Sequence, residues 1–154
     1  MFIEPMLLGK REEPFNDSRY VFQPKFDGHR LILSYTAGQV RLYTRHNNEV
    51  TRQYPELHNV PIDGAIDVVL DGEVARMDEV GWIDFELIME RFRLTKDPWI
   101  RVAVRTRPVI FYVYDVLQYN GKDTRGWPLT ERLAFLSRIL KPDHYFSLVL
   151  SIEG

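Results

Sequence analysis

Cysteine is absent from this sequence, and none of its apolar runs is long. Without cysteine the chain has no disulfide, no thiolate zinc ligand and no cysteine nucleophile, and it is compatible with a reducing compartment. The apolar runs fall far short of the roughly 18 residues that a membrane span needs. The N-terminus lacks the basic start and long apolar stretch of a signal peptide. These absences predict a cytoplasmic protein without a membrane segment.

The sequence also lacks a large excess of charge of either sign. The formal net charge is −2, whereas domains that bind nucleic acid are often strongly basic. Bulk charge leaves that class open, because a local basic face is enough to meet phosphates. The composition is otherwise that of a folded domain, with 154 residues of which 45% are hydrophobic and 27% are charged.

Short apolar segments separated by turn residues predict several strands. Residues 31–35 and 40–44 flank the turn signal Thr36-Ala37-Gly38-Gln39 and predict a hairpin. Asp71-Gly72-Glu73 is interpreted as a second turn between strands, and Asn120-Gly121 as a third. The other predicted strands are residues 20–24, 66–70, 74–77, 109–117 and 145–150.

Two segments have the spacing of amphipathic helices. From about Asp84 onwards apolar residues recur at i, i+3, i+4 and i+7, and residues 129–140 carry a stripe of leucines. Asp97-Pro98 predicts a further helix, with a capping side chain before a proline at the first helical position. Strands outnumber helices and hairpins are frequent. The predicted class is therefore α+β, with mainly antiparallel sheets and flanking helices.

The first candidate for chemistry is the run Lys25-Phe26-Asp27-Gly28-His29-Arg30. A lysine at a strand end can point its amine into a cleft, but its ordinary pKa of about 10.4 makes it a poor nucleophile at neutral pH. Nearby cations or a bound metal lower that pKa. Gly28 permits a tight turn, and Arg30 supplies a planar fork for phosphate or ribose oxygens. A plain charged strand end beside a surface turn is the alternative.

Three further candidate segments follow along the chain. Arg45 ends a strand and suits anionic ligand atoms. Asp71 and Glu73 flank a glycine and suit sugar hydroxyls or a hard cation. Tyr114 lies in an apolar, aromatic strand and suits stacking on a base. Taken singly, each segment is also explained as a solvated arginine, a hairpin turn or a core strand.

The order of these segments resembles that of the motifs in covalent nucleotidyltransferases, which include DNA ligases, RNA ligases and mRNA-capping enzymes. The lysine run resembles motif I, Thr44-Arg45 with Thr51 resembles the segment after it, and residues 70–73 resemble motif III. Other segments resemble ATP-dependent DNA ligases in particular. They are the upstream Pro5-Met6-Leu7, the motif IIIa segment 111–117 with Asn120-Gly121-Lys122-Asp123, and the helix start Pro128-Leu129-Thr130-Glu131-Arg132.

The resemblance implies an ATP-grasp-like nucleotidyltransferase core that uses ATP and Mg²⁺. Lys25 would attack the α-phosphate of ATP and retain AMP as a phosphoramidate. Arg30 and Arg45 would meet the ribose and phosphates, Glu73 a ribose hydroxyl and Tyr114 the adenine ring. The full set of implied nucleotide-binding residues is Gln23, Asp27, Arg30, Arg45, Glu73 and Tyr114.

Some positions depart from the family pattern. Tyr114 stands where the family usually has Phe, which keeps a stacking face, and Gln23 stands where it often has Glu and where the adenine edge is met. His46-Asn47-Asn48 replaces a glycine-containing turn, and asparagine tolerates the left-handed backbone that such a turn requires. Glu153 resembles a glutamate of motif IV that is associated with a metal.

The end of the sequence coincides with the start of motif IV in that family. The resemblance therefore implies one adenylation domain over residues 1–154 that is C-terminally incomplete and lacks the OB-fold domain. Phosphoryl transfer depends on positioned cations. We therefore expect such a piece to bind nucleotide but to be weak or inactive in self-adenylation by itself.

A local basic stretch spans residues 89–107, with six basic residues against two acidic ones and with interleaved aromatic residues. It is the best candidate for contact with DNA phosphates, although a solvated pair of helices is the alternative. The DNA-contacting candidates are Arg91, Arg93, Lys96, Arg101 and Arg105. The four histidines have no metal-ligand spacing and are interpreted as non-ligands.

The leading hypothesis is a monomeric DNA ligase core acting on nicked double-stranded DNA. The complete enzyme would pass AMP from the lysine to a 5′-phosphate, which the 3′-hydroxyl then attacks with release of AMP, in replication, repair or recombination. An RNA ligase or a GTP-using capping enzyme shares the Lys-x-Asp-Gly core and remains open. A non-catalytic nucleic-acid or nucleotide-binding module also remains open.

Overall fold

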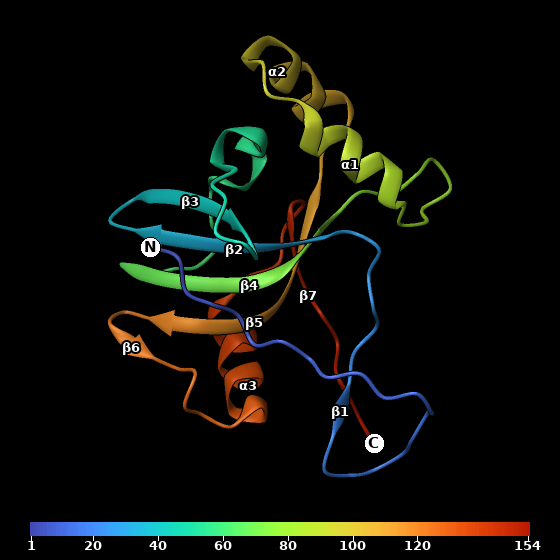
Figure 1. The fold of residues 1–154 in the computed structure, drawn as a ribbon. Coiled ribbons are helices and arrows are strands. Elements are labelled where there is room, and N and C mark those ends of the chain that lie inside the picture. Colours follow the sequence, from blue (N-terminus) through green and yellow to red (C-terminus); the bar gives the residue numbers. More distant parts are fainter.

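The computed structural model describes all of residues 1–154 and is built around one twisted sheet (Figure 1). Five strands follow the order β3-β2-β4-β5-β6, with every neighbour antiparallel, and β7 adds to β5 in parallel. A separate two-stranded ribbon joins β1 to β8. The bounds are β1 (Val21–Phe22), β2 (His29–Thr36), β3 (Gln39–Thr44), β4 (Asp67–Ala75), β5 (Ile110–Tyr119), β6 (Lys122–Asp123), β7 (Phe146–Leu148) and β8 (Ile152–Glu153).

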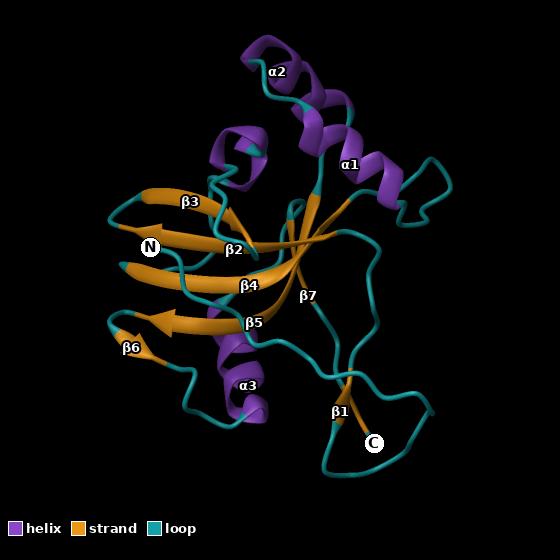
Figure 2. Ribbon diagram, viewed as in Figure 1, coloured by secondary structure: helices purple, strands orange, loops and turns teal.

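Helices cover one side and one end of this sheet. Figure 2 shows α1 and α2 together at the upper end and α3 beside β5 below. The bounds are α1 (Phe85–Arg93), α2 (Asp97–Thr106) and α3 (Leu129–Ile139), with two short 3-10 turns at η1 (Thr51–Gln53) and η2 (Pro55–Leu57). The α+β class with mainly antiparallel sheets is confirmed. None of these helices combines the length and the apolar character needed to cross a membrane.

The two faces of the sheet are unequal. One face carries the main core, in which alternate residues such as Leu31, Leu33 and Leu70 pack with Ile88 of α1 and Leu136 of α3. The opposite face has only a small apolar cluster, which consists of Ile3, Ile32, Val69 and Leu117. The N-terminal segment therefore covers part of the second face, and Figure 1 shows it passing in front of the strands. The rest of that face is left for polar side chains.

The turn predicted at Asp71-Gly72-Glu73 is wrong, because these residues lie inside the continuous central strand β4. A glycine is needed there, since a Cβ on Gly72 would lie 2.3 Å from the Tyr112 carbonyl oxygen and 2.6 Å from the Phe111 ring. Asp71 is tolerated in a central strand because an arginine from β2 pairs with it. Asp71 and Glu73 are two residues apart and thus share one face of the sheet.

Most local predictions agree with the structure. The hairpin between β2 and β3 turns at Ala37 and Gly38, which have φ angles of 49° and 85°. Asp84 caps α1 by accepting the backbone N–H groups of Glu86 and Leu87. Asp97, by contrast, is itself the first residue of α2 and caps nothing; its carboxylate pairs with Arg52 at 2.8 Å. The predicted strands at residues 20–24 and 145–150 are shorter than expected.

Candidate active site

A cavity of about 880 Å³ opens over the polar part of the second sheet face. Its floor is made by adjacent strands, which contribute Arg30, Asp71, Glu73, Tyr114 and Asp115. Its walls are mainly apolar and come from the N-terminal segment, the region around β1 and helix α1. These wall residues include Met6, Leu8, Val21, Pro24, Phe26, Phe85, Met89 and Phe92.

Lys25 lies in the loop between β1 and β2 and lines this cavity. The loop is fixed on both sides of the lysine. On one side the Phe26 ring stacks on Tyr112 of β5, with centroids 4.2 Å apart and planes inclined by 15°. On the other side Gly28 lies against Val74 of β4, where a Cβ would be 2.1 Å from the carbonyl oxygen. Lys25 is therefore an exposed side chain on an anchored backbone.

Glu73 faces the same loop from β4. Its side chain packs against Gly28, where an added Cβ would lie 3.1 Å from Glu73 Cγ. Burial raises the pKa of Glu73 to about 7, and the nearby Asp71 adds to this, while Arg30 opposes it. Glu73 is thus a half-buried acceptor that titrates near neutral pH, next to the lysine loop.

Arg30 and Asp71 form an ion pair across β2 and β4. Arg30 donates from Nε to Asp71 Oδ1 at 3.0 Å and from Nη2 to Oδ2 at 2.6 Å. Nη2 also donates to the Met6 carbonyl oxygen at 2.6 Å. Burial raises the pKa of Asp71 to about 6, against the opposing effect of its Arg30 contacts. The guanidinium lies 5.3 Å from the Tyr114 ring centroid.

A β-bulge explains how two consecutive residues of β5 both reach the cavity. Asp71 pairs with Asp115 and the next residue, Gly72, pairs with Val113, so Tyr114 is an extra residue in β5. Without the bulge Tyr114 and Asp115 would point to opposite faces, yet both line the cavity. Burial raises the pKa of Tyr114, so its hydroxyl stays protonated and able to donate at neutral pH.

The structure brings together most of the residues that the sequence singled out. Six of them line the cavity: Gln23, Lys25, Arg30, Arg45, Glu73 and Tyr114. Gln23 donates from Nε2 to Ser151 Oγ at 2.9 Å, and Arg45 is exposed just after β3, with Nε 3.2 Å from His46 Nε2. Asp27 is exposed and lies outside the cavity lining.

Other lining residues were missed from the sequence. His29 lies under the lysine loop, where its Nε2 is 2.6 Å from the Tyr54 hydroxyl and its ring meets Phe92 edge-on. Burial lowers the pKa of His29 to about 4, so it is neutral at pH 7. Asp115 was missed because only the bulge turns it toward the cavity. A histidine inside the motif I run was the one available signal for His29.

The acidic residues do not form a metal site by themselves. No group of three or more histidines and carboxylates is arranged to hold an ion. Glu153, the predicted metal-associated residue, is exposed on β8 opposite Val21 and is outside the cavity lining. Two of the three carboxylates in the lining, Asp71 and Asp115, are already paired with arginines. A Mg²⁺ ion would not find a complete set of protein ligands here.

The basic stretch divides into one buried residue and several exposed ones. Arg91 is fully buried and pairs with Glu56 at 2.5 Å. It also donates to the carbonyl oxygens of Gln53 and Arg107. The prediction that Arg91 contacts DNA is therefore wrong, because its charge is neutralised inside the fold. The other four candidates are exposed on or between α1 and α2: Arg93, Lys96, Arg101 and Arg105.

Comparison with known proteins bears directly on this arrangement. The family model described as "ATP dependent DNA ligase domain" matches residues 7–153. The SPbeta prophage-derived DNA ligase-like protein LigB of Bacillus subtilis is 46% identical over 155 residues, which cover 100% of this chain and 52% of that protein. A DNA ligase of Aeropyrum pernix is 28% identical, over 98% of this chain and 26% of its own length.

Solved structures agree in fold. The ligase domain of LigD from Mycobacterium tuberculosis is 25% identical, with a TM-score of 0.64, over 87% of this chain and 40% of that one. A mycobacterial DNA ligase D complexed with ATP and MES has a TM-score of 0.62 at 24% identity, over the same shares of the two chains. The chain spans about half the length of LigB and less of the other relatives. From the cavity, the motif order and these matches together, the chain belongs to the ATP-dependent DNA ligase domain family.

Proposed function

We propose that this chain is the adenylation core of a DNA ligase and that Lys25 is its covalent nucleophile. The observation that carries the proposal is the convergence of Lys25, Arg30, Glu73 and Tyr114 on one cavity from three segments that are far apart in the sequence. In the reaction the Lys25 amine attacks the α-phosphorus of ATP. The bond to the β-phosphate breaks, pyrophosphate leaves, and AMP stays on the lysine as a phosphoramidate.

The polar floor suits a nucleoside. The Tyr114 ring offers a stacking face for adenine, and Gln23 offers an amide for the edge of the base. Glu73 accepts a ribose hydroxyl. Arg30 uses Nε and Nη2 on Asp71 and Met6, which leaves Nη1 for ribose or phosphate oxygens. Arg45 is an exposed residue of the cavity lining and contacts the phosphates. Asp27 contacts the nucleotide from outside the cavity lining.

Magnesium enters this proposal with the nucleotide. Mg²⁺ keeps several waters and is held by substrate phosphates with one or two carboxylates, which agrees with the lack of a complete protein site. When bound, it would neutralise phosphate charge. The predicted contribution of Glu153 would require the β1–β8 ribbon to approach the phosphates.

The proposed nucleic-acid partner is nicked double-stranded DNA, bound by a monomer in the cytoplasm. AMP would pass from Lys25 to the 5′-phosphate, and the 3′-hydroxyl would displace it to seal nicks left by replication, repair or recombination. Arg93, Lys96, Arg101 and Arg105 would contact DNA phosphates. Because the chain covers 52% of LigB and 26% of the Aeropyrum ligase, we propose that an OB-fold domain and further cations complete the whole enzyme.

The test is nucleotide binding and labelling. We expect the chain to bind ATP, and to form with α-labelled ATP and Mg²⁺ a slow adduct that is acid-labile and absent in Lys25→Ala. Glu73→Ala and Tyr114→Ala should weaken ATP binding. Equal labelling of Lys25→Ala would refute the nucleophile. A preference for GTP over ATP would point to a capping enzyme, and activity confined to nicked RNA would point to an RNA ligase.

A further inference from the structure

Arg132 is far from Lys25 in sequence, yet it pairs with Asp115, which lies in the floor of the same cavity. It lies on α3, in the segment Pro128-Leu129-Thr130-Glu131-Arg132, and is 6% exposed. Its Nε donates to Asp115 Oδ1 at 2.8 Å and its Nη2 to Oδ2 at 3.1 Å. Its Nη1 donates to the Trp127 carbonyl oxygen at 2.7 Å. The planar fork is thus fully engaged between α3 and β5.

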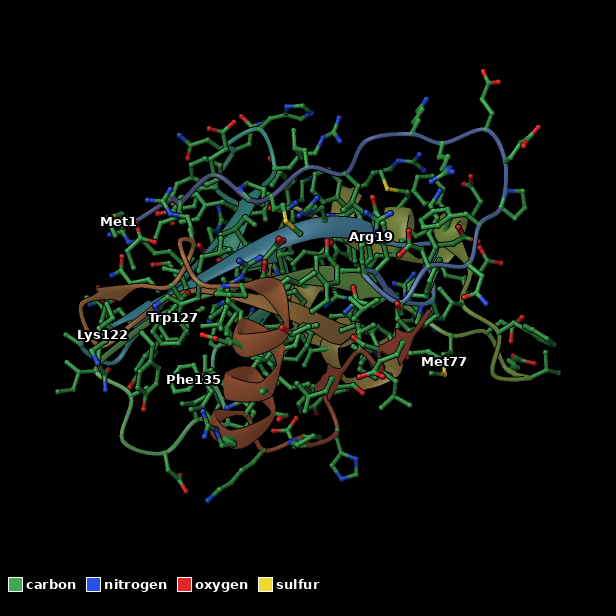
Figure 3. The ribbon with its side chains drawn as sticks, turned by 90° about the horizontal axis from the view of Figure 1, so that it is seen from below. Met1, Arg19, Met77, Lys122, Trp127 and Phe135 are labelled. Atoms are coloured by element: carbon green, nitrogen blue, oxygen red, sulfur yellow. The ribbon has the colours of Figure 1, made fainter.

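The loop before α3 is itself well anchored. The Trp127 ring packs against Phe135 of α3, with centroids 5.6 Å apart, and Figure 3 shows both residues beside that helix. Phe135 in turn meets Tyr119 of β5 at 5.0 Å. These packed rings anchor the segment that carries Arg132, so Arg132 can fix the position of Asp115.

Asp115 lies in the cavity floor next to the β-bulge. It directly follows the bulged residue Tyr114 and is paired in register with Asp71. Asp71 and Asp115 are both buried carboxylates, and Asp115 raises the pKa of Asp71. Each carboxylate has its own arginine, Arg30 for Asp71 and Arg132 for Asp115. Two ion pairs therefore lie side by side beneath the cavity.

Met6 connects the two ion pairs. Its carbonyl oxygen accepts from Arg30 Nη2 at 2.6 Å, and its Sδ lies 3.8 Å from Arg132 Nη2. Met6 also lines the cavity, as does Leu8. Both arginines thus hold the N-terminal segment in place as a wall.

We propose that Arg132 is a positioning residue for the nucleotide, a role that rests on the proposed function above. Through Asp115 it fixes the bulge that aims Tyr114, and through Met6 it helps to close the wall. It touches neither Lys25 nor the phosphates. It governs the affinity for the nucleotide and leaves the rate of transfer to Lys25 unchanged.

The variants must separate positioning from folding. Arg132→Met alone leaves Asp115 buried without a partner, which is strongly destabilising. The double variant Arg132→Met/Asp115→Asn removes both charges, and the asparagine Oδ1 still accepts the Val116 N–H that Asp115 accepts at 2.9 Å. The matched exposed control is Arg125→Met/Asp123→Asn, which removes the neighbouring exposed pair.

Two measurements decide the matter. Hydrogen exchange without ligand should show faster exchange of the Tyr114 and Asp115 amides in the double variant, with the β2–β4 core unchanged. In ATP titration and labelling, the double variant should raise Kd and apparent KM by about tenfold and leave the saturating rate within about twofold of wild type. The exposed control should resemble wild type in both.

The outcomes separate this inference from the proposed function. If the wild-type chain binds no adenine nucleotide, the proposed function fails, and hydrogen exchange alone decides whether Arg132 positions the bulge. Unchanged exchange in the double variant overturns the inference. So does wild-type ATP affinity in the double variant. A lowered saturating rate with unchanged KM also overturns it.

Discussion

Gly28 and Val74 approach each other so closely that a Cβ on Gly28 would lie 2.1 Å from the Val74 carbonyl oxygen. Backbone carbonyls cannot yield as side chains do, so any side chain at this position must push the lysine loop away from β4. Gly28→Ala is expected to cost about 1–3 kcal/mol of stability and to abolish labelling of Lys25. Urea unfolding and the labelling assay measure these two effects.

The control for Gly28 is another glycine outside helices and strands. Gly126 has no atom within 4 Å of an added Cβ and no positive φ. Gly126→Ala should therefore behave as wild type in both assays. Equal loss in the two variants would mean that the close approach to Val74 does not hold the loop.

Glu73 gives the protein a specific pH dependence. Burial raises its pKa from 4.5 to about 7, so the folded state disfavours the ionised form. Relative to Glu73→Gln, the wild-type protein has its full stability below pH 4.5 and loses it as the pH rises through about 7. The free energy of unfolding of the two proteins, measured from about pH 4 to 8, gives the difference. A flat difference over this window would contradict the prediction.

Local sequence signals predicted the parts of the fold that depend on neighbouring residues. The β2–β3 hairpin follows from Ala37-Gly38, which take positive φ angles, and the start of α1 follows from the capping carboxylate of Asp84. The site residues Arg30, Glu73 and Tyr114 came from a resemblance in motif order, and the structure brings them to one cavity. Their proposed roles remain predictions.

The failures have a different physical origin, since each depends on a distant partner. Asp71-Gly72-Glu73 has the composition of a turn, but pairing with Arg30 keeps it inside a central strand. Arg91 lies in a stretch whose composition is typical of a surface, but it is buried because it pairs with Glu56. The two residues are 35 positions apart in sequence, and their side chains are 2.5 Å apart in the structure. The bulge at Tyr114 depends on the register of two strands. Composition and periodicity carry no information on such pairs.

The buried Arg91–Glu56 pair predicts a contrast within the basic stretch. Glu56 Oε1 accepts from Arg91 and from the Val109 N–H, while Oε2 has no partner at all. Arg91→Met would leave a buried carboxylate largely uncompensated and is expected to cost about 3–5 kcal/mol. Arg105→Met changes an exposed residue on α2 and should leave stability nearly unchanged. Chemical denaturation of the two variants measures the contrast, and similar destabilisation of both would contradict it.

The exposed arginines of α2 should act on DNA instead. Arg101 and Arg105 are four residues apart on the helix and thus adjacent on its exposed side. Replacing either one with alanine should weaken binding to nicked duplex and reduce the slope of log affinity against log salt by about 0.9 for each phosphate that is no longer neutralised. Arg138→Ala, on α3 away from α2 (Figure 1), removes a comparable exposed charge and is the control. The salt slope measures the counterions that binding displaces. An equal change in the α2 variant and in Arg138→Ala would therefore reveal only a general effect of charge. A change confined to the α2 variant identifies the exposed side of α2 as the DNA-binding surface.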